Sequence, residues 1–128
     1  MTRVVTLIQC ALAVLVFSCT TPTIPLPPPE VEAIEFTLEE GWATFRYTLP
    51  KVDYANARVF IMNEDLGGKG IVAAAAADGS VPQTQPFQAA VGHRIQVIFA
   101  RDAEPDESSA RVCVVFRPGS LTDEDFCR

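Results

Sequence analysis

The chain is poor in the residues that most enzymes use for acid–base and nucleophilic chemistry. It contains one histidine, His93, and no serine within a Gly-x-Ser-x-Gly sequence. Nucleophilic catalysis needs a base that orients the nucleophile, and a lone histidine beside a turn is more often solvated. The glycines at 67, 68 and 70 lie in a predicted hairpin turn with no predicted helix behind it, so they do not indicate a phosphate-binding loop. We predict a protein without enzymatic activity and without a cofactor.

Basic residues and paired cysteine motifs are also scarce. The chain has ten lysines and arginines and sixteen acidic residues, which gives a net charge of −6. A nucleic-acid or anionic-lipid footprint needs a basic patch, so we predict no nucleic-acid partner. The four cysteines form no Cys-x-x-Cys pair, which removes the usual signature of redox catalysis and of structural zinc.

No apolar run is long enough to cross a bilayer core, which takes about 20 residues. The N-terminal run at 4–17 has fourteen mostly apolar residues and follows Arg3. Its length and its flanks are typical of the apolar region of a secretory signal peptide.

The residues that end this run, Val16-Phe17-Ser18-Cys19, resemble the lipobox of bacterial lipoproteins. The resemblance implies that residues 1–18 are a lipoprotein signal peptide, that diacylglycerol is attached to the Cys19 sulfur, and that the new amino group is acylated. Several acyl chains anchor a protein stably, whereas one chain binds a membrane only marginally. Thr20 stands where an aspartate would imply retention in the inner membrane, so the resemblance favours the outer membrane. An ordinary signal peptide, with Cys19 left as a free or paired thiol, is the alternative.

Removal of residues 1–18 leaves 110 residues, enough for one domain. Nine basic and sixteen acidic side chains then give a net charge of −7, because only Arg3 is lost. Cys10 is lost as well, and Cys113 and Cys127 form an even pair in a chain bound for an oxidising compartment. We predict a disulfide, which for a loop of about 15 residues contributes roughly 3 kcal/mol. Two reduced thiols are the alternative.

The segment at 19–30 combines the proposed lipid anchor with a proline-rich linker. Five of the ten residues at 20–29 are proline, which excludes a helix or a central strand. We predict an extended polyproline II spacer of about 30 Å that holds the domain away from the membrane. A ligand for a proline-recognising module is the alternative.

From residue 31 onward, apolar residues alternate with polar ones over short stretches that end at glycine, proline or aspartate. This period of two predicts half-buried β-strands. The sequence therefore predicts an all-β domain at 31–128, a seven-stranded antiparallel sandwich with a disulfide-tied C-terminal tail. The predicted strands lie at 34–39, 42–49, 58–63, 70–77, 81–89, 94–101 and 111–117.

Residues 71–77 leave two interpretations open. Five consecutive alanines have high helix propensity. A helix of about two turns is marginal on its own, however, and Gly70 and Asp78-Gly79 flank the stretch. We predict a strand.

Three stretches, at 57–61, 71–80 and 91–97, resemble bacterial Ig-like domains: an alternating strand, an Ala-Asp-Gly-Ser turn and a Gly-x-x-Ile strand. The resemblance covers roughly residues 31–117 and implies an Ig-like or fibronectin-like sandwich. It implies no single function.

Two functions follow as hypotheses. The first is a lipid-anchored, non-enzymatic module of the bacterial cell envelope that contacts an unidentified envelope protein through sheet edges or loops. The loops at 102–109 and 54–56 are the ones to watch as contact surfaces. The alternative is a carbohydrate-binding domain that stacks a glycan on Trp42 and Tyr54.

The loop at 102–109 is also the best candidate for a metal site. Asp102, Glu104 and Asp106 alternate as in the first half of a calcium loop. Glu107 takes the position of the required glycine, however, and Cys113 that of the bidentate glutamate. We predict a solvated acidic loop, with weak calcium binding as the alternative.

Overall fold

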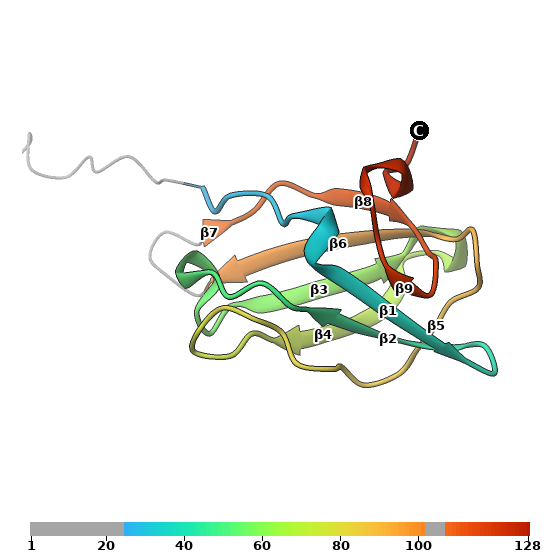
Figure 1. Ribbon diagram of the computed structural model, residues 1–128, viewed down its shortest axis with the longest axis horizontal. Helices are drawn as coiled ribbons and strands as arrows, with labels where there is room; N and C mark the ends of the chain where they lie inside the picture. The colour runs from blue at the N-terminus through green and yellow to red at the C-terminus, as the bar shows by residue number, and fades with distance from the viewer. Residues whose placement is uncertain (1–24, 102–106) are drawn as a thin grey trace, which may run out of the picture.

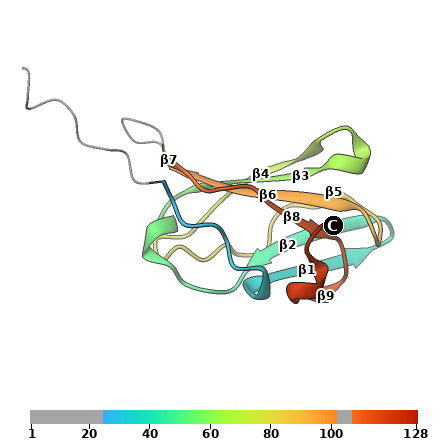
Figure 2. The same ribbon diagram turned by 90° about the horizontal axis from the view of Figure 1, so that it is seen from above.

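The computed structural model describes residues 25–101 and 107–128, and in these residues the protein is built from two facing antiparallel sheets (Figures 1 and 2). The all-β prediction is confirmed, but the described residues form nine strands and not seven. The strands are β1 (Ile34–Glu39), β2 (Trp42–Tyr47), β3 (Arg58–Asn63), β4 (Lys69–Ala74), β5 (Phe87–Gln88), β6 (Arg94–Arg101), β7 (Glu107–Ser108), β8 (Val112–Val115) and β9 (Gly119–Ser120). The described residues also form four 3₁₀ turns: η1 (Val31–Ala33) before β1, η2 (Val52–Tyr54) and η3 (Glu64–Leu66) between strands, and η4 (Asp123–Asp125) after β9.

The first sheet has the order β5-β2-β1-β9. The second has the order β4-β3-β6, and both β7 and β8 pair with the far edge of β6. Strand β7 pairs with the end of β6 and β8 with its first half, so the two follow one another along a single edge. Each sheet is therefore about four strands wide.

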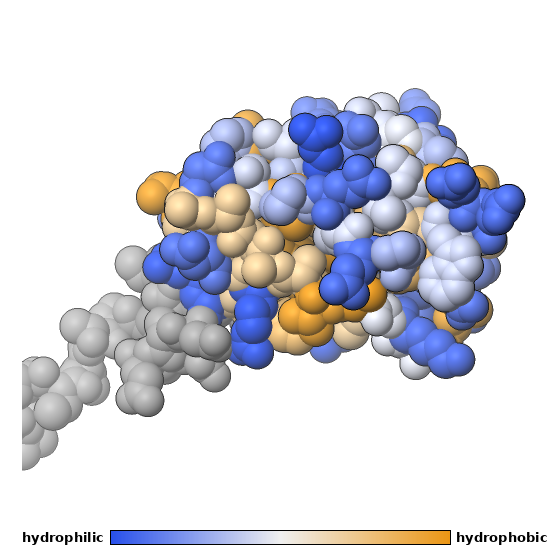
Figure 3. All heavy atoms as spheres, turned by 90° about the horizontal axis from the view of Figure 1, so that it is seen from below, coloured by the Kyte–Doolittle hydropathy of each residue, from blue (hydrophilic) through white to orange (hydrophobic). Residues whose placement is uncertain are grey.

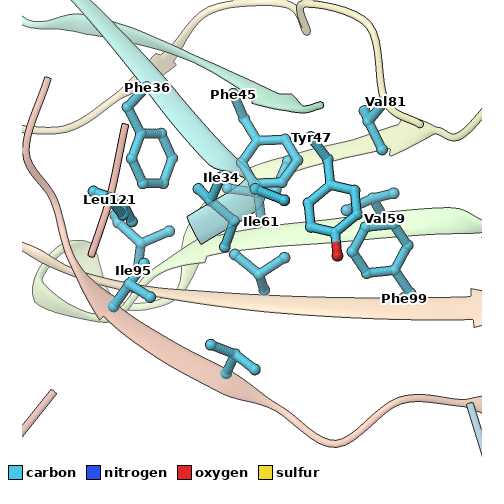
Figure 4. Packing of buried hydrophobic residues seen from close by; sticks show 14 of the residues in the cluster. Ile34, Phe36, Phe45, Tyr47, Val59, Ile61, Val81, Ile95, Phe99 and Leu121 are labelled. Carbon is cyan, nitrogen blue, oxygen red and sulfur yellow. The ribbon is translucent and has the colours of Figure 1, made fainter. Parts of the chain in front are cut away.

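The alternation seen in the sequence places one face of β1, β2, β3, β6 and β8 in the core, and Ile71 and Ala73 of β4 pack against it partly buried (Figure 4). Aromatic rings fill the space between the sheets: Phe36 lies 4.9 Å from Phe116, and Tyr54 stacks on Phe99 with 4.0 Å between ring centroids. Burial of each such ring contributes about 1.5–3 kcal/mol. The fully buried large side chains are Tyr47, Tyr54, Phe36, Phe45, Phe99, Phe116, Ile34, Ile61, Ile95, Val59, Val81 and Val97.

The alanine-rich stretch forms strand β4, as predicted, but the strand ends at Ala74 and not at residue 77. The Ala76 N–H donates to the carbonyl of Ser80, which closes a turn instead of continuing the ladder. Gly79 in this turn is buried and has φ 86°, and a Cβ there would lie 1.7 Å from the Lys51 carbonyl oxygen. The turn therefore requires glycine.

The predicted strand at 81–89 is broken. Only β5 and an isolated bridge between Val81 and Tyr47 pair with β2. Pro82 and Pro86 have no N–H to donate, which prevents a regular ladder. Thr84 compensates, because its N–H donates to the Phe45 carbonyl and its Oγ1 accepts from the Phe45 N–H at 3.0 Å.

The folded domain extends to Leu26, five residues before the expected boundary at 31. Leu26 is 7% exposed, and its N–H donates to the Ser108 carbonyl at 3.2 Å. The Tyr54 hydroxyl donates to the Pro27 carbonyl, and the Glu30 N–H donates to the Tyr47 hydroxyl at 3.0 Å. The last part of the predicted spacer therefore lies against the domain.

The C-terminal tail, residues 116–128, connects the two sheets (Figure 2). Strand β9 pairs with β1 of the first sheet, and residues 126–127 then return to β8 of the second. The predicted disulfide between Cys113 and Cys127 is present, with 5.4 Å between the Cα atoms, and the Cys127 N–H donates to the Cys113 carbonyl. The Arg117 guanidinium holds the Asp125 carboxylate at 2.9 Å.

Candidate functional site

Strand β4 is the exception among the sheet edges of the described residues. Leu26 covers the edge at β7, and residues 126–127 cover the edge at β8. Strand β9 is two residues long, and the 81–88 edge carries two prolines. Strand β4 is six residues long, lacks proline, and pairs only with β3. Natural sheets block such edges with proline, charge or a covering segment, because free backbone groups invite pairing with another chain.

The register shows which backbone groups of β4 are free. The Ala75 N–H donates to the Ala57 carbonyl at 2.8 Å, one step beyond the β3–β4 ladder. Bonded and non-bonded pairs alternate in an antiparallel ladder, so the N–H and C=O of Gly70, Val72 and Ala74 face away from β3. The Val72 side chain is 60% exposed, and no acidic residue occurs between Lys69 and Ala77. After Lys69 at its start, the edge is thus apolar from Gly70 to Ala74, and three of these residues are ready to pair.

Beside this edge lie three adjoining hollows, which we call together the Trp42 groove. Figure 3 shows this side of the molecule, with apolar side chains gathered in a strip among polar ones. The hollow beside β4 has a volume of about 260 Å³ and is lined by residues 71–74 and 82–85. The middle hollow, about 290 Å³, is lined by Trp42, Lys69, Gly70, Ile71, Pro86, Phe87 and Gln88. The last, about 310 Å³, is lined by Thr37, Glu39, Glu40, Trp42, Thr44, Gln83 and Pro86.

The last hollow has a distinct chemistry, since it joins an exposed indole to two carboxylates. Trp42 is 50% exposed and lies opposite Glu39 in the β1–β2 ladder, so both side chains lie on the outer face of the sheet. The hydroxyls of Thr37 and Thr44, the next outward pair, bond to each other. Neither Glu39 nor Glu40 has an ion-pair partner within residues 25–101 and 107–128. The hollow therefore presents uncompensated negative charge beside an aromatic face.

The two aromatic residues predicted as a glycan platform have different positions. Trp42 is exposed, in agreement with that hypothesis. Tyr54 is fully buried, stacks on Phe99, and cannot contact a ligand, so its predicted role is wrong. Burial raises the pKa of Tyr54 above its ordinary value, with smaller contributions from Tyr47 and Asp53. Tyr54 is a core residue that also binds the N-terminal segment.

His93 is structural and not simply solvated. Its Nδ1 lies 2.9 Å from Nδ2 of the fully buried Asn63 and 3.2 Å from the Ala90 nitrogen, and both of these donate. Asn63 also donates to the Gln88 carbonyl at 3.1 Å, which connects β3 with β5 of the other sheet. The histidine therefore completes a polar contact between the layers.

The ion pairs of the domain stabilise turns. The Arg94 side chain and N–H donate to Asp65 at 3.0 and 2.6 Å and lower the pKa of that carboxyl. Arg117 lowers the pKa of Asp125 in the same way, with help from the Thr122 N–H. Neither pair lines the Trp42 groove.

Several predicted positions lie outside the described residues: the lipidation residue Cys19, the signal peptide, and the candidate calcium ligands Asp102, Glu104 and Asp106. In the part of the chain that is described, no cluster of three or more histidine, cysteine or acidic side chains could hold a metal ion. None of its helices has the length and apolar character needed to span a membrane.

The groove was not predicted from the sequence, although two signals for it were present. One is the run from residue 70 to residue 77 without charge or proline, and the other is the pair of prolines in the segment that faces it. Comparison of the chain with family models, with curated proteins and with solved structures finds no match.

Proposed function

We propose that this protein is a lipid-anchored, non-enzymatic module of the bacterial cell envelope, in the outer membrane, that binds another envelope protein. Binding occurs by addition of a partner strand to β4. The open β4 edge beside the Trp42 groove is the observation that supports this most strongly, because the other edges of the described sheets are covered, short or interrupted by proline. In such complexes, backbone hydrogen bonds provide affinity and side-chain pockets provide specificity.

The strand arrangement supports the finer proposal of an Ig-like domain. The first, second and fifth extended segments (β1, β2 and 81–88) form one sheet. The third, fourth and sixth (β3, β4 and β6) form the other, together with β8. This distribution fits an Ig-like sandwich whose fourth strand has joined the sheet of the third.

The anchor proposal depends on Cys19. The six residues between Cys19 and the docked Leu26 span at most about 25 Å, so the domain would stay close to the lipid surface. Mass spectrometry of the N-terminus of membrane-extracted protein tests this directly. The expected species begins at Cys19 and carries the mass of a diacylglycerol and an acyl chain; an unmodified residue 19 would refute the anchor.

Photo-cross-linking in intact cells tests strand addition. A photoreactive amino acid at Gln85, which is exposed and lines the groove, should capture a partner. Val72→Pro should abolish the adduct, because it removes an outward N–H while leaving the β3 ladder intact. Val52→Pro is the matched control: this valine is 79% exposed at the first position of η2, where proline is well tolerated. An adduct that survives Val72→Pro would contradict strand addition.

Carbohydrate binding is the second candidate, favoured by the exposed Trp42 ring with Gln83, Thr37 and Thr44 around it. A glycan array should then show binding that Trp42→Ala removes. Absence of signal from the parent protein would end this hypothesis.

A further inference from the structure

We infer that the strand that adds to β4 carries a lysine or arginine, whose side chain binds against Trp42 between Glu39 and Glu40. This inference rests on the proposed function, and it specifies the chemistry of the partner: an extended peptide segment with a basic side chain next to the part that pairs with β4.

The hollows provide a continuous path from β4 to the two carboxylates. Gly70, whose backbone groups face the open side, lines the middle hollow together with Trp42. Trp42 also lines the last hollow with Glu39 and Glu40. A segment that pairs with Val72 and Gly70 and continues through the middle hollow therefore reaches the indole and then the carboxylates.

Charge complementarity identifies the side chain. The residues that line the last hollow include two acidic side chains and no basic one, and neither acid is paired within the described residues. A cation over an indole ring is attracted by the ring, and a carboxylate beside it adds a charge-assisted hydrogen bond. Lys69, the basic residue of the groove, lines the middle hollow and would repel a cation there. A basic side chain is therefore favoured in the last hollow.

The hairpin between β1 and β2, which carries Glu39 and Glu40, has an unusual backbone conformation at Glu40. Glu40 adopts φ 51°, a left-handed conformation that glycine or asparagine occupies at lower cost. The conformation sets Glu40 beside Glu39 at the tip of β1, on the same side as Trp42. The three groups thus belong to one short, hydrogen-bonded hairpin.

The first step of the test is peptide display on the full-length protein purified in detergent. A library of random twelve-residue peptides is selected for binding. The most enriched peptide is then synthesised in two versions, one with its basic residue and one with glutamine in that position. We expect enriched peptides to share a β-prone core followed by a lysine or arginine. The glutamine twin should bind at least about tenfold more weakly.

Variants of the protein then locate the contact. Glu39→Gln with Glu40→Gln should weaken the basic peptide at least about tenfold and leave its glutamine twin unaffected. The double variant Glu32→Gln with Asp53→Asn removes the same charge from two exposed residues outside the groove and should change neither affinity. Affinity for the basic peptide should also fall with salt in the parent protein and lose this dependence in Glu39→Gln with Glu40→Gln.

The outcomes separate this inference from the proposed function. One outcome would overturn the inference but retain strand addition. In it, peptides without a basic residue bind, Val72→Pro abolishes their binding, and Glu39→Gln with Glu40→Gln leaves it unchanged. No peptide binding, with a glycan signal that Trp42→Ala removes, would overturn both in favour of a carbohydrate ligand. If neither peptides nor glycans bind, both the inference and the proposed function are overturned.

Discussion

The two sides of the sandwich differ in how their sheet edges end. On the closed side, the tail at 116–128 pairs with β1 and with β8, and the Cys113–Cys127 disulfide fixes its end. On the open side, β4 and the 81–88 segment face each other across hollows of about 260–290 Å³. Nothing in the described residues pairs with the outer edge of β4.

Only some of the sheet edges in this domain are therefore protected. The open side includes one protected edge, since Pro82 and Pro86 interrupt the 81–88 segment, and one unprotected edge directly opposite. From Gly70 to Ala74 this edge carries neither charge nor proline, the features with which natural proteins usually block an open edge. The contrast is therefore the strongest structural argument for a partner at β4.

The largest expected effect concerns the closed side. Replacing Cys113 and Cys127 with alanine should lower the free energy of unfolding by about 3 kcal/mol, because the cross-link constrains the unfolded chain. Urea denaturation of the parent and variant measures this. The parent under reducing agent is the control and should match the variant. A loss below about 0.5 kcal/mol would mean that β9 and the tail hold the closed side without the disulfide.

On the open side, Gly70→Ala should cost about 2 kcal/mol and detach part of β4. A Cβ at this position would lie 1.8 Å from the Ile61 carbonyl oxygen, which belongs to the β3 backbone and cannot move aside. The neighbouring Val72→Ala, at an exposed position, is the control and should cost less than about 0.5 kcal/mol. Hydrogen exchange should show faster exchange in β3 and β4 but not in β1. Equal stability of Gly70→Ala and the parent would contradict the close packing of β4 on β3.

Much of this architecture was predictable, because the alternation in β1, β2, β3, β6 and β8 is local and period-two patterning determines which face is buried. The disulfide followed from an even pair of cysteines. The alanine-rich strand was predictable only because flanking glycines left no room for a stable helix.

Other features depended on tertiary partners that a sequence pattern does not contain. Tyr54 next to a turn resembled an exposed platform, yet the space beside Phe99 buries it. Leu26 is a single apolar residue among prolines, and its docking depends on Ser108, more than eighty positions away. The Trp42 groove likewise forms between segments remote in the chain, so its residues carry no shared motif.

A smaller effect is expected from Tyr54→Phe, which removes a hydrogen bond to Pro27 near the N-terminal end of the domain. The loss should be about 1 kcal/mol at neutral pH. Burial raises the pKa of Tyr54, so the neutral phenol stabilises the fold fully below the unfolded pKa near 10, and this contribution is lost as pH rises further. Thermal melts from pH 8 to pH 11 should therefore show a declining midpoint in the parent and a shallower decline in the variant. Identical slopes would mean that Tyr54 does not couple alkaline pH to stability.

The smallest expected effect again concerns the closed side. Arg117 and the Thr122 N–H lower the pKa of Asp125, so the carboxylate stabilises the tail above the unfolded pKa near 3.8, and this contribution is lost as pH falls through the folded value. Asp125→Asn should cost less than about 1 kcal/mol at pH 7, because the Arg117 side chain is 45% exposed and solvent screens the pair. The difference in the free energy of unfolding between Asp125→Asn and the parent should shrink when unfolding is measured at pH 3. Asp123→Asn, at an exposed position in η4, is the control and should leave the pH dependence unchanged. A difference that stays constant with pH would assign the tail's attachment to the disulfide and to β9 alone. The ion pair would then not stabilise the closed side.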